Sequence, residues 1–406
     1  KKTLELLKKS VEESLISDVP ISVCISGGID SSSILALIPK EARERTSTFS
    51  AGFGIPAFDE LSYAEYAAQY YRTDHHEVII KEDSYQFWPE IIWHLDEPIA
   101  DATCIPLYCL SKEINKKASV LLTGDGGDEQ FAGYPQFQFM KLHQYFGRMP
   151  QFLQNASVNT LKGTPPSLLN YFFKYSSDLG DAGKKRLSWF LANSQPNRAY
   201  EELMSVFNKQ ERESLFTNAK GKISTDLQSY LVTAQNFKTS SPLDRIFMMD
   251  RQLTLTDQIL MKTDKCTMAH SLEARVPYLN NAITDLSRSM PSYLKLKGLK
   301  EKYILRKALK NRVPKKILNR KKANFFVPIQ AWFQKDLMTI SKELLSKKKM
   351  QKQGIFEHRY IEKCIRHYDN SPLYCARQLW ALLTFQIWHQ MYIEEHSMKF
   401  THKKYF

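Results

Sequence analysis

One glycine- and serine-rich segment constrains the fold of this chain more than any other feature. It follows the apolar run 19–25, typical of a short buried strand, and precedes a helical apolar pattern over 33–38. The residues between them, 26–32, read Ser-Gly-Gly-Ile-Asp-Ser-Ser. Paired glycines let a ligand approach the backbone closely, and a helix start presents free N–H groups that favour an anion. The segment therefore predicts a strand–loop–helix unit that binds phosphate, with Asp30 as a Mg²⁺ ligand.

Other loop types and a turn that binds nothing are the alternatives at residues 26–32. A Walker loop requires a lysine after the glycines, and the dinucleotide pattern G-x-G-x-x-G is also absent. The pattern Ser-Gly-Gly-x-Asp-Ser-Ser instead resembles the pyrophosphate loop of the ATP-pyrophosphatase superfamily. That resemblance implies cleavage of ATP to AMP and pyrophosphate, followed by attack on an adenylate.

Strands and helices alternate along the first third of the chain. Further strands are predicted at residues 46–53, 75–80 and 118–123. Helical patterns are found at residues 4–15, 60–71, 85–94 and 106–115. The alternation predicts an α/β fold with a doubly wound parallel sheet over residues 18–135, elaborated by helices from 136 onward. Ligands of such sheets lie at the carboxyl ends of the strands, so the segment after 118–123 is the second place to look.

That second segment is rich in carboxylates. Residues 123–129 read Thr-Gly-Asp-Gly-Gly-Asp-Glu, with three glycines and three acids. Acids beside a triphosphate make sense only if metal ions lie between them, and a carboxylate could also accept the proton of an incoming amine. A calcium loop is the alternative, but the EF-hand spacing is absent. A Mg·ATP site is therefore the preferred interpretation.

Composition excludes several classes of protein. The six cysteines form no C-x-x-C pair, which disfavours a zinc ribbon or a disulfide framework and fits a reducing cytosol, so a cytoplasmic location is expected. No apolar run approaches the ~18 residues of a membrane span, and the first residues do not resemble a signal peptide.

The positive charge of the chain is concentrated in one region. The net charge is +14, and residues 295–322 contain thirteen Lys or Arg and a single acid, Glu301. This stretch could be a solvated helical face, a funnel for ATP and pyrophosphate, or a nucleic-acid surface. The funnel is favoured over nucleic acid because no aromatic-interleaved basic repeat accompanies the charge.

The two loops, together with three further blocks, resemble the synthetase domain of the glutamine-hydrolysing asparagine synthetases. The blocks lie at residues 260–279, 300–306 and 322–328, in the order of that family. The resemblance implies an adenine nucleotide alpha hydrolase-like fold with large helical insertions. It also implies a carbon–nitrogen ligase that uses ATP and Mg²⁺ to amidate a carboxylate through an acyl-adenylate, most simply aspartate to asparagine. Four segments are expected: an α/β core at 1–135, a helical insertion at 136–250, a helical completion of the active site at 251–335, and a C-terminal helical tail at 336–406.

The resemblance also implies site residues. ATP contacts fall on Ile25, Ser26, Gly27, Gly28, Asp30, Ser31, Ser32, Ala51, Thr123 and Gly124. It assigns Mg²⁺ binding to Asp30 and Asp128, and it assigns catalytic roles to Asp125, Lys302 and Glu273. The acid substrate is assigned to Asp101, Thr103, Glu129 and Arg275. Glu273 and Arg275 could instead form a buried ion pair that positions a helix end.

Three departures from the family pattern leave the acid open. Asp125 stands where the family usually has Glu, and Asn324 replaces the usual Gly before Phe325. The loop 96–106 lacks the Thr-Thr-x-Arg of well-studied members, with Ala102 at the position of the Arg. It looks more like the Asp-Glu-Pro-x-x-Asp variant of bacterial homologues, which include enzymes amidating other acids.

The partners expected from the resemblance are a small acid and ammonia. Family members carry an N-terminal cysteine that hydrolyses glutamine, whereas this sequence begins with Lys1 and its first cysteine is Cys24. We therefore expect an N-terminal or separate glutaminase domain, and a homodimer is possible in principle. The rival functions are amidation of another acid, such as a sugar uronate or a peptide side chain, and a non-catalytic nucleic-acid-binding module. A tRNA-thiolating pyrophosphatase is disfavoured because paired catalytic cysteines are lacking.

Overall fold

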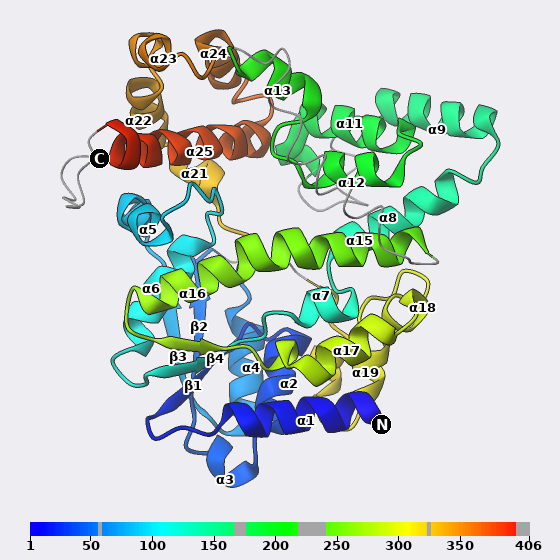
Figure 1. The fold of residues 1–406 in the computed structure, drawn as a ribbon, viewed down its shortest axis with the longest axis vertical. Coiled ribbons are helices and arrows are strands. Elements are labelled where there is room, and N and C mark those ends of the chain that lie inside the picture. The colour runs from blue at the N-terminus through cyan, green and yellow to red at the C-terminus, as the bar shows by residue number, and fades with distance from the viewer. Residues whose placement is uncertain (56–58, 166–175, 218–240, 323–325, 395–406) are drawn as a thin grey trace. The chain divides into compact units, whose positions relative to one another are not determined.

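Five parallel strands form one sheet in the order β3-β2-β1-β4-β5 (Figure 1). The strands are β1 (Ile21–Cys24), β2 (Ser47–Gly52), β3 (Asp74–Ile79), β4 (Val120–Leu122) and β5 (Glu273–Arg275). In register, Val23 pairs with Thr48 on one side and with Leu122 on the other. The predicted α/β fold with a parallel sheet is confirmed. The order reverses at β1, which places a topological switch point between β1 and β4.

The edge strand β5 was not predicted. It pairs with β4 through Val120↔Glu273 and Leu122↔Arg275, so the sheet extends beyond the residues 18–135 to which we confined it. Its sequence, Glu-Ala-Arg, is short and polar, which hides it from a search for apolar runs.

The computed structural model describes residues 1–55, 59–165, 176–217, 241–322 and 326–394. They fall into two compact units. The sheet unit comprises Lys1–Leu95, Thr103–Gln138 and Phe247–Val327, and the helical unit comprises Asp96–Ala102, Phe139–Ile246 and Pro328–Phe406. Asn324, which replaces the family's usual Gly, and the following Phe325 both lie outside the described residues.

Helices account for most of the remaining structure. In the sheet unit they are α1 (Lys2–Ser14), α2 (Ile29–Leu37), α3 (Lys40–Arg43), α4 (Leu61–Tyr71), α5 (Trp88–Leu95), α6 (Cys104–Ile114), α7 (Gly127–Phe131), a π-helix (Arg251–Leu260), α16 (Met261–Met268), α17 (Asn281–Ser289), α18 (Ser292–Lys295), α19 (Tyr303–Ala308) and α20 (Lys315–Leu318). In the helical unit they are α9 (Gln151–Gly163), α11 (Ser176–Ala192), α12 (Pro196–Met204), α13 (Lys209–Leu215), α21 (Ile329–Phe333), α22 (Asp336–Leu344), α23 (Lys347–Gln353), α24 (His358–Arg366), α25 (Pro372–His389) and a π-helix (Gln390–Glu394). The helices α8 (Pro135–Phe146) and α15 (Pro242–Asp250) each contribute to both units.

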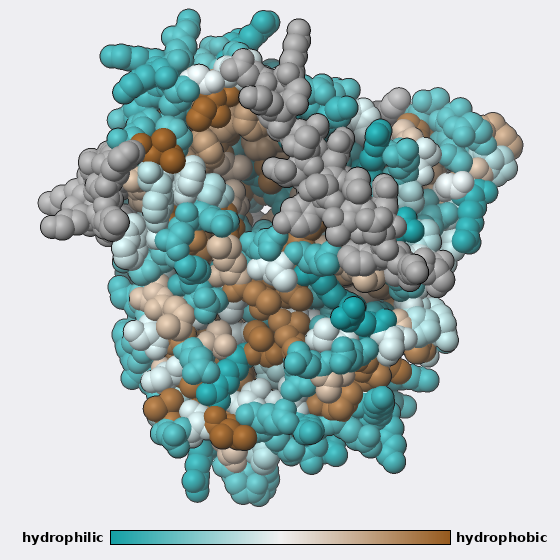
Figure 2. Space-filling view, viewed as in Figure 1, coloured by the Kyte–Doolittle hydropathy of each residue, from teal (hydrophilic) through white to brown (hydrophobic). Residues whose placement is uncertain are grey.

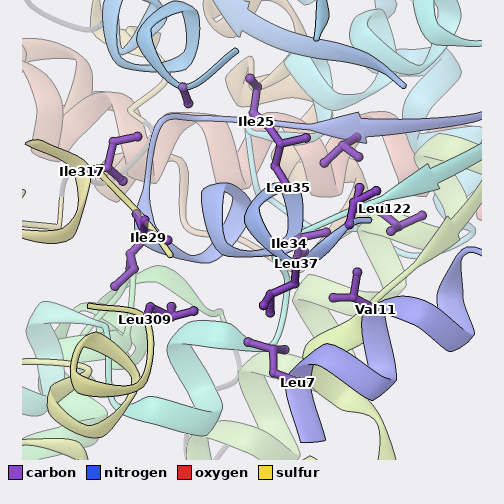
Figure 3. Close-up of a cluster of buried hydrophobic side chains, with 14 of the residues drawn as sticks. Leu7, Val11, Ile25, Ile29, Ile34, Leu35, Leu37, Leu122, Leu309 and Ile317 are labelled. Atoms are coloured by element: carbon purple, nitrogen blue, oxygen red, sulfur yellow. The ribbon is translucent and has the colours of Figure 1, made fainter. Parts of the chain in front are cut away.

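Both faces of the sheet are buried, as expected of a doubly wound fold. On one face, Val23 and Ile25 join a core with α1 and α2, to which Leu7 and Leu35 contribute (Figure 3). On the other face, Leu121 packs in a second core that contains Leu110 and Ile114 of α6. Each fully buried aliphatic side chain contributes roughly 1.5–3 kcal/mol. Adjacent strand residues thus point into different cores, which explains the continuous apolar runs of β1 and β4.

Among the described residues, no helix combines the length and the hydrophobicity that crossing a membrane requires. Figure 2 shows, over the sheet unit, a hydrophilic surface interrupted by separate apolar patches. All six cysteines are free thiols in the structure.

Candidate active site

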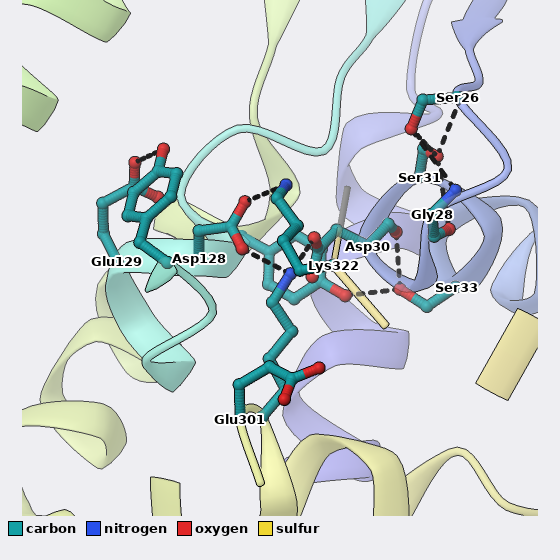
Figure 4. A network of polar contacts seen from close by, with 12 residues as sticks. Ser26, Gly28, Asp30, Ser31, Ser33, Asp128, Glu129, Glu301 and Lys322 are labelled. Carbon is teal, nitrogen blue, oxygen red and sulfur yellow. Dashed lines mark hydrogen bonds and ion pairs between the residues drawn. The ribbon is translucent and has the colours of Figure 1, made fainter. Parts of the chain in front are cut away.

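The loop between β1 and α2 is folded tightly enough to exclude side chains. Gly27 has φ +64°, and a Cβ at this position would lie 2.4 Å from the Cβ of Tyr63 on α4. The Ser26 hydroxyl accepts from the Gly28 N–H at 3.3 Å, and the Ser31 hydroxyl accepts from the Ser26 N–H at 3.2 Å (Figure 4). No side chain of the described residues caps the start of α2. The loop therefore presents a compact turn whose helix N-terminus favours an anion.

The loop between β4 and α7 touches the first loop directly. A Cβ on Gly124 would lie 3.0 Å from the Ser31 nitrogen, and one on Gly127 would lie 2.7 Å from Asp30 Cγ. Glycine at these two positions is what lets the second loop reach Asp30. The two predicted phosphate loops are thus brought together at the carboxyl ends of β1 and β4, where the strand order reverses.

Two aspartates and two lysines form the centre of the site (Figure 4). The Lys302 ammonium pairs with Asp30 Oδ2 and, at 2.6 Å, with Asp128 Oδ1. The Lys322 ammonium lies 2.7 Å from Asp128 Oδ2. The Lys302 side chain is 1% exposed, so its charge is committed to this cluster. We call these four residues the charged cluster.

The backbone of Lys302 is strained where it enters the charged cluster. Its φ is +53°, a left-handed value that costs a non-glycine residue about 1–3 kcal/mol. The same residue is the N-cap of α19. Strain of this kind persists when the surroundings fix the residue, and here two buried carboxylates fix it.

The two aspartates differ in electrostatic environment. Burial raises the pKa of Asp128, but Lys302 and Lys322 outweigh burial and lower it to about 2. Burial raises the pKa of Asp30, the charge of Asp128 adds to the rise, and the Lys302 and Lys322 ammonium groups only partly oppose it. Asp30 Oδ1 is buried and has no hydrogen-bond partner among the described residues. An additional cation at Asp30 would satisfy that oxygen.

The donor set fits Mg²⁺. Magnesium is commonly held by one or two carboxylates, with substrate phosphates and waters completing its shell. Asp30 and Asp128 share the Lys302 ammonium and supply carboxylate oxygens, one of which is orphaned. Among the residues that the structure describes, no group of three or more His, Cys, Asp or Glu side chains could form an all-protein metal site.

Glu129 follows Asp128 in α7 but takes no part in the charged cluster. Its Oε1 accepts a 2.6 Å hydrogen bond from the Tyr134 hydroxyl (Figure 4). Burial, and then the charge of Asp128, raise the pKa of Glu129 to about 8. The predicted role in binding the acid substrate is therefore not visible in its contacts. Glu129 is a buried carboxyl whose pKa lies well above its ordinary value.

Asp125, in the second loop, is held by two threonine hydroxyls. Its Oδ2 accepts from the Thr123 hydroxyl at 3.0 Å and from the Thr263 hydroxyl at 2.9 Å. Thr263 lies in α16, so this contact fastens a distant helix to the end of β4. Burial, and then the charge of Asp125, raise the pKa of the Cys24 thiol to about 12. Asp125 is thus a rigid acceptor beside the end of β1.

The basic stretch 295–322 divides between structural and site roles. Arg306 is buried, pairs with Glu301, and donates to the Glu301 carbonyl at 3.0 Å. Arg320 donates to the Ser26 carbonyl at 3.2 Å, pairs with Glu60, and lies 4.0 Å from the Tyr63 ring. Together with Lys302 and Lys322, Arg320 brings positive charge to the first loop, in keeping with the funnel interpretation.

Two further predicted residues, Glu273 and Arg275, take no part in the charged cluster. Glu273 is exposed at the start of β5 and pairs with Arg275 at 2.8 Å. Arg275 donates to the carbonyls of Ser14 and Ile16, which positions the end of α1. This contact matches the ion-pair alternative, although the pair is not buried. The catalytic role of Glu273 and the substrate role of Arg275 remain predictions.

The remaining predicted residues divide among the core, α6 and the helical unit. Ile25 is a core residue, and Ala51 packs against the core beneath α6. The Ser32 hydroxyl is buried and has no hydrogen-bond partner among the described residues. Thr103 precedes α6, whereas Asp101 belongs to the helical unit. Burial lowers the pKa of Arg377, and the charge of Asp101 partly opposes that lowering.

Sequence reasoning missed three residues that contact the site. Lys322 was noted only as the start of a block, and Thr263 and Arg320 were not singled out. Lys322 had a usable signal, because it lies in the same basic stretch as Lys302. Thr263 had none, because a threonine 138 residues from its aspartate partner leaves no local pattern.

The fold and the site define an α/β protein with paired aspartates and lysines at the switch point of a parallel sheet. A family model described as asparagine synthase matches residues 2–390. The chain belongs to the asparagine synthase family.

Relatives in the curated collection agree with the family. The chain is 30% identical to asparagine synthetase (glutamine-hydrolysing) 1 of Bacillus subtilis, over 98% of this chain and 60% of that protein. It is 29% identical to a Mycobacterium tuberculosis protein provisionally named as the same enzyme, over 97% of this chain and 58% of the relative. A Penicillium rubens protein named amidase chyE is 26% identical over 88% of this chain and 57% of the relative. The chain therefore spans about 60% of the length of the first of these relatives.

Proposed function

We propose that this chain catalyses ATP-dependent amidation of a carboxylic acid, with aspartate as the acid and asparagine as the product. The observation that carries the proposal is the contact of two glycine loops at the switch point, with the charged cluster between them. Family membership supports the same chemistry. An adenylate pathway needs a site that holds three phosphates and releases two of them, and paired ammonium groups beside two carboxylates suit that task.

The reaction balances in two steps. An oxygen of the substrate carboxylate attacks the α-phosphorus of ATP, the bond to the β-phosphate breaks, and pyrophosphate leaves. The nitrogen of ammonia then attacks the acyl carbon, the bond to AMP breaks, and one proton is given up. Activation is necessary because AMP is a good leaving group and a bare carboxylate offers none.

The protein's residues have separate tasks in this scheme. The start of α2 and the Ser26 and Ser31 hydroxyls bind phosphate oxygens. The Lys302 and Lys322 ammonium groups stabilise the negative charge that develops as pyrophosphate departs. Asp30 and Asp128 would hold Mg²⁺, which when bound supplies further neutralisation of the phosphates. Asp125, whose Oδ2 accepts from two threonine hydroxyls, would accept the proton of the attacking amine.

A second candidate is amidation of an acid other than aspartate. Ala102 stands where well-studied asparagine synthetases have an arginine, and two relatives carry the name amidase. A sugar uronate or a peptide side chain would then replace aspartate. The same site would perform the same two steps, so only the acid-binding residues distinguish the two candidates.

The source of ammonia is a further part of the proposal. We propose that a glutaminase, as a domain or a separate chain, supplies ammonia to this site in a cytoplasmic enzyme. The Cys24 thiol, with its pKa raised to about 12 by burial and by Asp125, is unsuited to hydrolyse glutamine. The chain alone should therefore depend on free ammonia.

The test supplies the purified chain with ATP, MgCl₂ and ammonium chloride together with a panel of acids. AMP, pyrophosphate and the amide are measured, and the Asp128→Asn variant serves as the inactive control. Asparagine formed with stoichiometric AMP is the expected result. A faster reaction with another acid would replace aspartate but keep the amidation, whereas ADP as the nucleotide product would overturn the adenylate scheme.

A further inference from the structure

The backbone of Ser26, which opens the first loop, is held through both of its polar groups. The Ser26 N–H donates to the Ser31 hydroxyl at 3.2 Å (Figure 4). The Ser26 carbonyl accepts from the Arg320 guanidinium at 3.2 Å, and the two residues are 294 positions apart in the sequence. Arg320 therefore fixes the first loop from outside it.

The Arg320 side chain is itself held by its surroundings within the sheet unit. Its guanidinium pairs with Glu60, and its Cζ lies 4.0 Å from the centroid of the Tyr63 ring. The buried Arg306 donates to the Arg320 carbonyl at 3.1 Å, which fixes the backbone at the same residue. The Arg320 side chain is 13% exposed. These contacts make Arg320 a donor of fixed position rather than a mobile surface charge.

The contact with Arg320 determines which way the next N–H points. In a trans peptide the carbonyl and the following N–H point in opposite directions, and no cis peptide bond is found in the described part of the chain. Because Arg320 holds the Ser26 carbonyl on one side of the loop, the Gly27 N–H is turned to the other side. Among the described residues, that N–H donates to no protein group. A backbone N–H of this kind, just before the start of α2, is a donor suited to a phosphate oxygen.

Tyr63 connects the loop to the guanidinium. A Cβ built on Gly27 would lie 2.4 Å from the carbonyl carbon of Tyr63, so the loop packs directly on α4. Lys316 in α20 approaches the same ring, with its Nζ 5.5 Å from the centroid. In the part of the chain that the structure describes, however, Lys316 forms no hydrogen bond with the loop. Arg320 and Lys316 thus share the aromatic contact but differ in the contact with Ser26.

We propose that Arg320 is a positioning residue for ATP, which aims the Gly27 N–H at a phosphate oxygen by holding the Ser26 carbonyl. The inference rests on the proposed amidation and adds to it a residue that acts through the backbone of the loop. It differs from the funnel interpretation, because the geometry of the guanidinium is what matters and Glu60 already offsets its charge. A lysine would keep the charge but would lack the planar fork that serves Glu60 and Ser26 together.

The experiment measures binding, so that it does not depend on turnover. Calorimetry follows α,β-methylene-ATP with MgCl₂ titrated into wild type, Arg320→Met, Arg320→Lys and Lys316→Met. Arg320→Met should weaken binding about 10- to 100-fold, as expected for the loss of one hydrogen bond to a charged group. Arg320→Lys should bind about as weakly as Arg320→Met, whereas the matched control Lys316→Met should bind like wild type.

Kinetics separate positioning from a general structural role. In ATP–pyrophosphate exchange, Arg320→Met should raise the KM for ATP by a similar factor, with a smaller change in kcat and no change in the KM for aspartate. An equal rise in both KM values would show that the variant only loosens the fold and would overturn the inference. Urea midpoints establish that each variant is folded, and if Arg320→Met is not, Arg320→Lys against wild type decides.

Three further outcomes overturn the inference. Wild-type affinity in Arg320→Lys would show that charge alone acts, and an equal loss in Lys316→Met would show that the ring contact is what matters. A wild-type chain that does not bind the analogue would refute a phosphate-binding role for the Gly27 N–H. If the wild-type chain binds the analogue but forms no amide, the proposed function fails, and the same titrations still decide the role of Arg320.

Discussion

Gly133 offers a sharp test of the charged cluster, because its missing side chain is what lets the cluster form. It follows Ala132, at the left-handed end of α7, and its N–H donates to the Asp128 carbonyl at 2.8 Å. A Cβ built on Gly133 would lie 1.9 Å from Asp128 Oδ1 and 2.0 Å from Lys302 Cε. Gly133→Ala must therefore displace one or both of these groups by more than 1 Å, since an ordinary contact is roughly 3.4 Å or longer.

The cost follows from the ion pair. At an effective dielectric constant of about 20, a pair at the observed 2.6 Å is worth roughly 6 kcal/mol, and one stretched to about 4 Å is worth roughly 4 kcal/mol. Overpacking adds about 1–3 kcal/mol. We expect Gly133→Ala to lower the free energy of unfolding by about 3 kcal/mol. A misplacement of about 1 Å at the reacting groups should lower the rate of ATP–pyrophosphate exchange about 100-fold.

The assay pairs this variant with Gly163→Ala. Gly163 ends α9, and a Cβ there would meet no heavy atom within 4 Å, so the substitution should be neutral or stabilise by up to about 1 kcal/mol. Urea midpoints and exchange rates are measured for both variants. If Gly133→Ala unfolds at the same urea concentration as Gly163→Ala and exchanges within threefold of wild type, the packing argument for the charged cluster is wrong.

Three further predictions concern the same site. Asp30→Asn should abolish ATP–pyrophosphate exchange while the circular dichroism stays unchanged, and exchange near the wild-type rate would refute the metal assignment. Glu129 has a folded-state pKa of about 8, above its unfolded value, so protonation favours the folded state and its contribution falls as pH rises toward and through 8. Glu129→Gln should therefore gain urea resistance relative to wild type between pH 6 and pH 9, and a constant difference would contradict the raised pKa. The chain should release no glutamate when it is given glutamine, and glutamate release would reveal a nucleophile other than Cys24. With ammonium chloride, amide formation should be faster at pH 8.5 than at pH 7, because more of the ammonia is then present as free base.

The sequence predicted the parts of the fold whose cause is local. The strands β1 and β4 are apolar runs that each lead into a glycine loop, because their side chains enter the cores on both faces of the sheet. The edge strand β5 escaped because three residues reading Glu-Ala-Arg carry no periodicity, and only pairing with β4 makes them a strand. The local pattern was therefore sufficient to predict β1 to β4 but not β5.

The candidate site follows the same division. Asp30 and Asp128 were found because each lies in a loop with its own glycine signature. Lys322 and Thr263 were missed because their partners lie 194 and 138 residues away in the sequence. Lys322 was marked only by the basic stretch that it shares with Lys302, and nothing near Thr263 marks its contact. Glu273 is the converse case, and its catalytic role stays a prediction. It lies in a recognisable block, but the strand it begins carries its side chain to an exposed position beside Arg275.

The place of β5 in the sheet has a consequence for how the chain is made. About 150 residues separate β4 (Val120–Leu122) from β5 (Glu273–Arg275), so a growing polypeptide exposes the open edge of β4 until β5 leaves the ribosome. Asp30 and Asp128 lack their Lys302 partner for longer still, because Lys302 is synthesised after β5. Nascent chains that end before Lys302 should therefore bind trigger factor or a similar holding chaperone, and release should coincide with synthesis of the residues that complete the charged cluster.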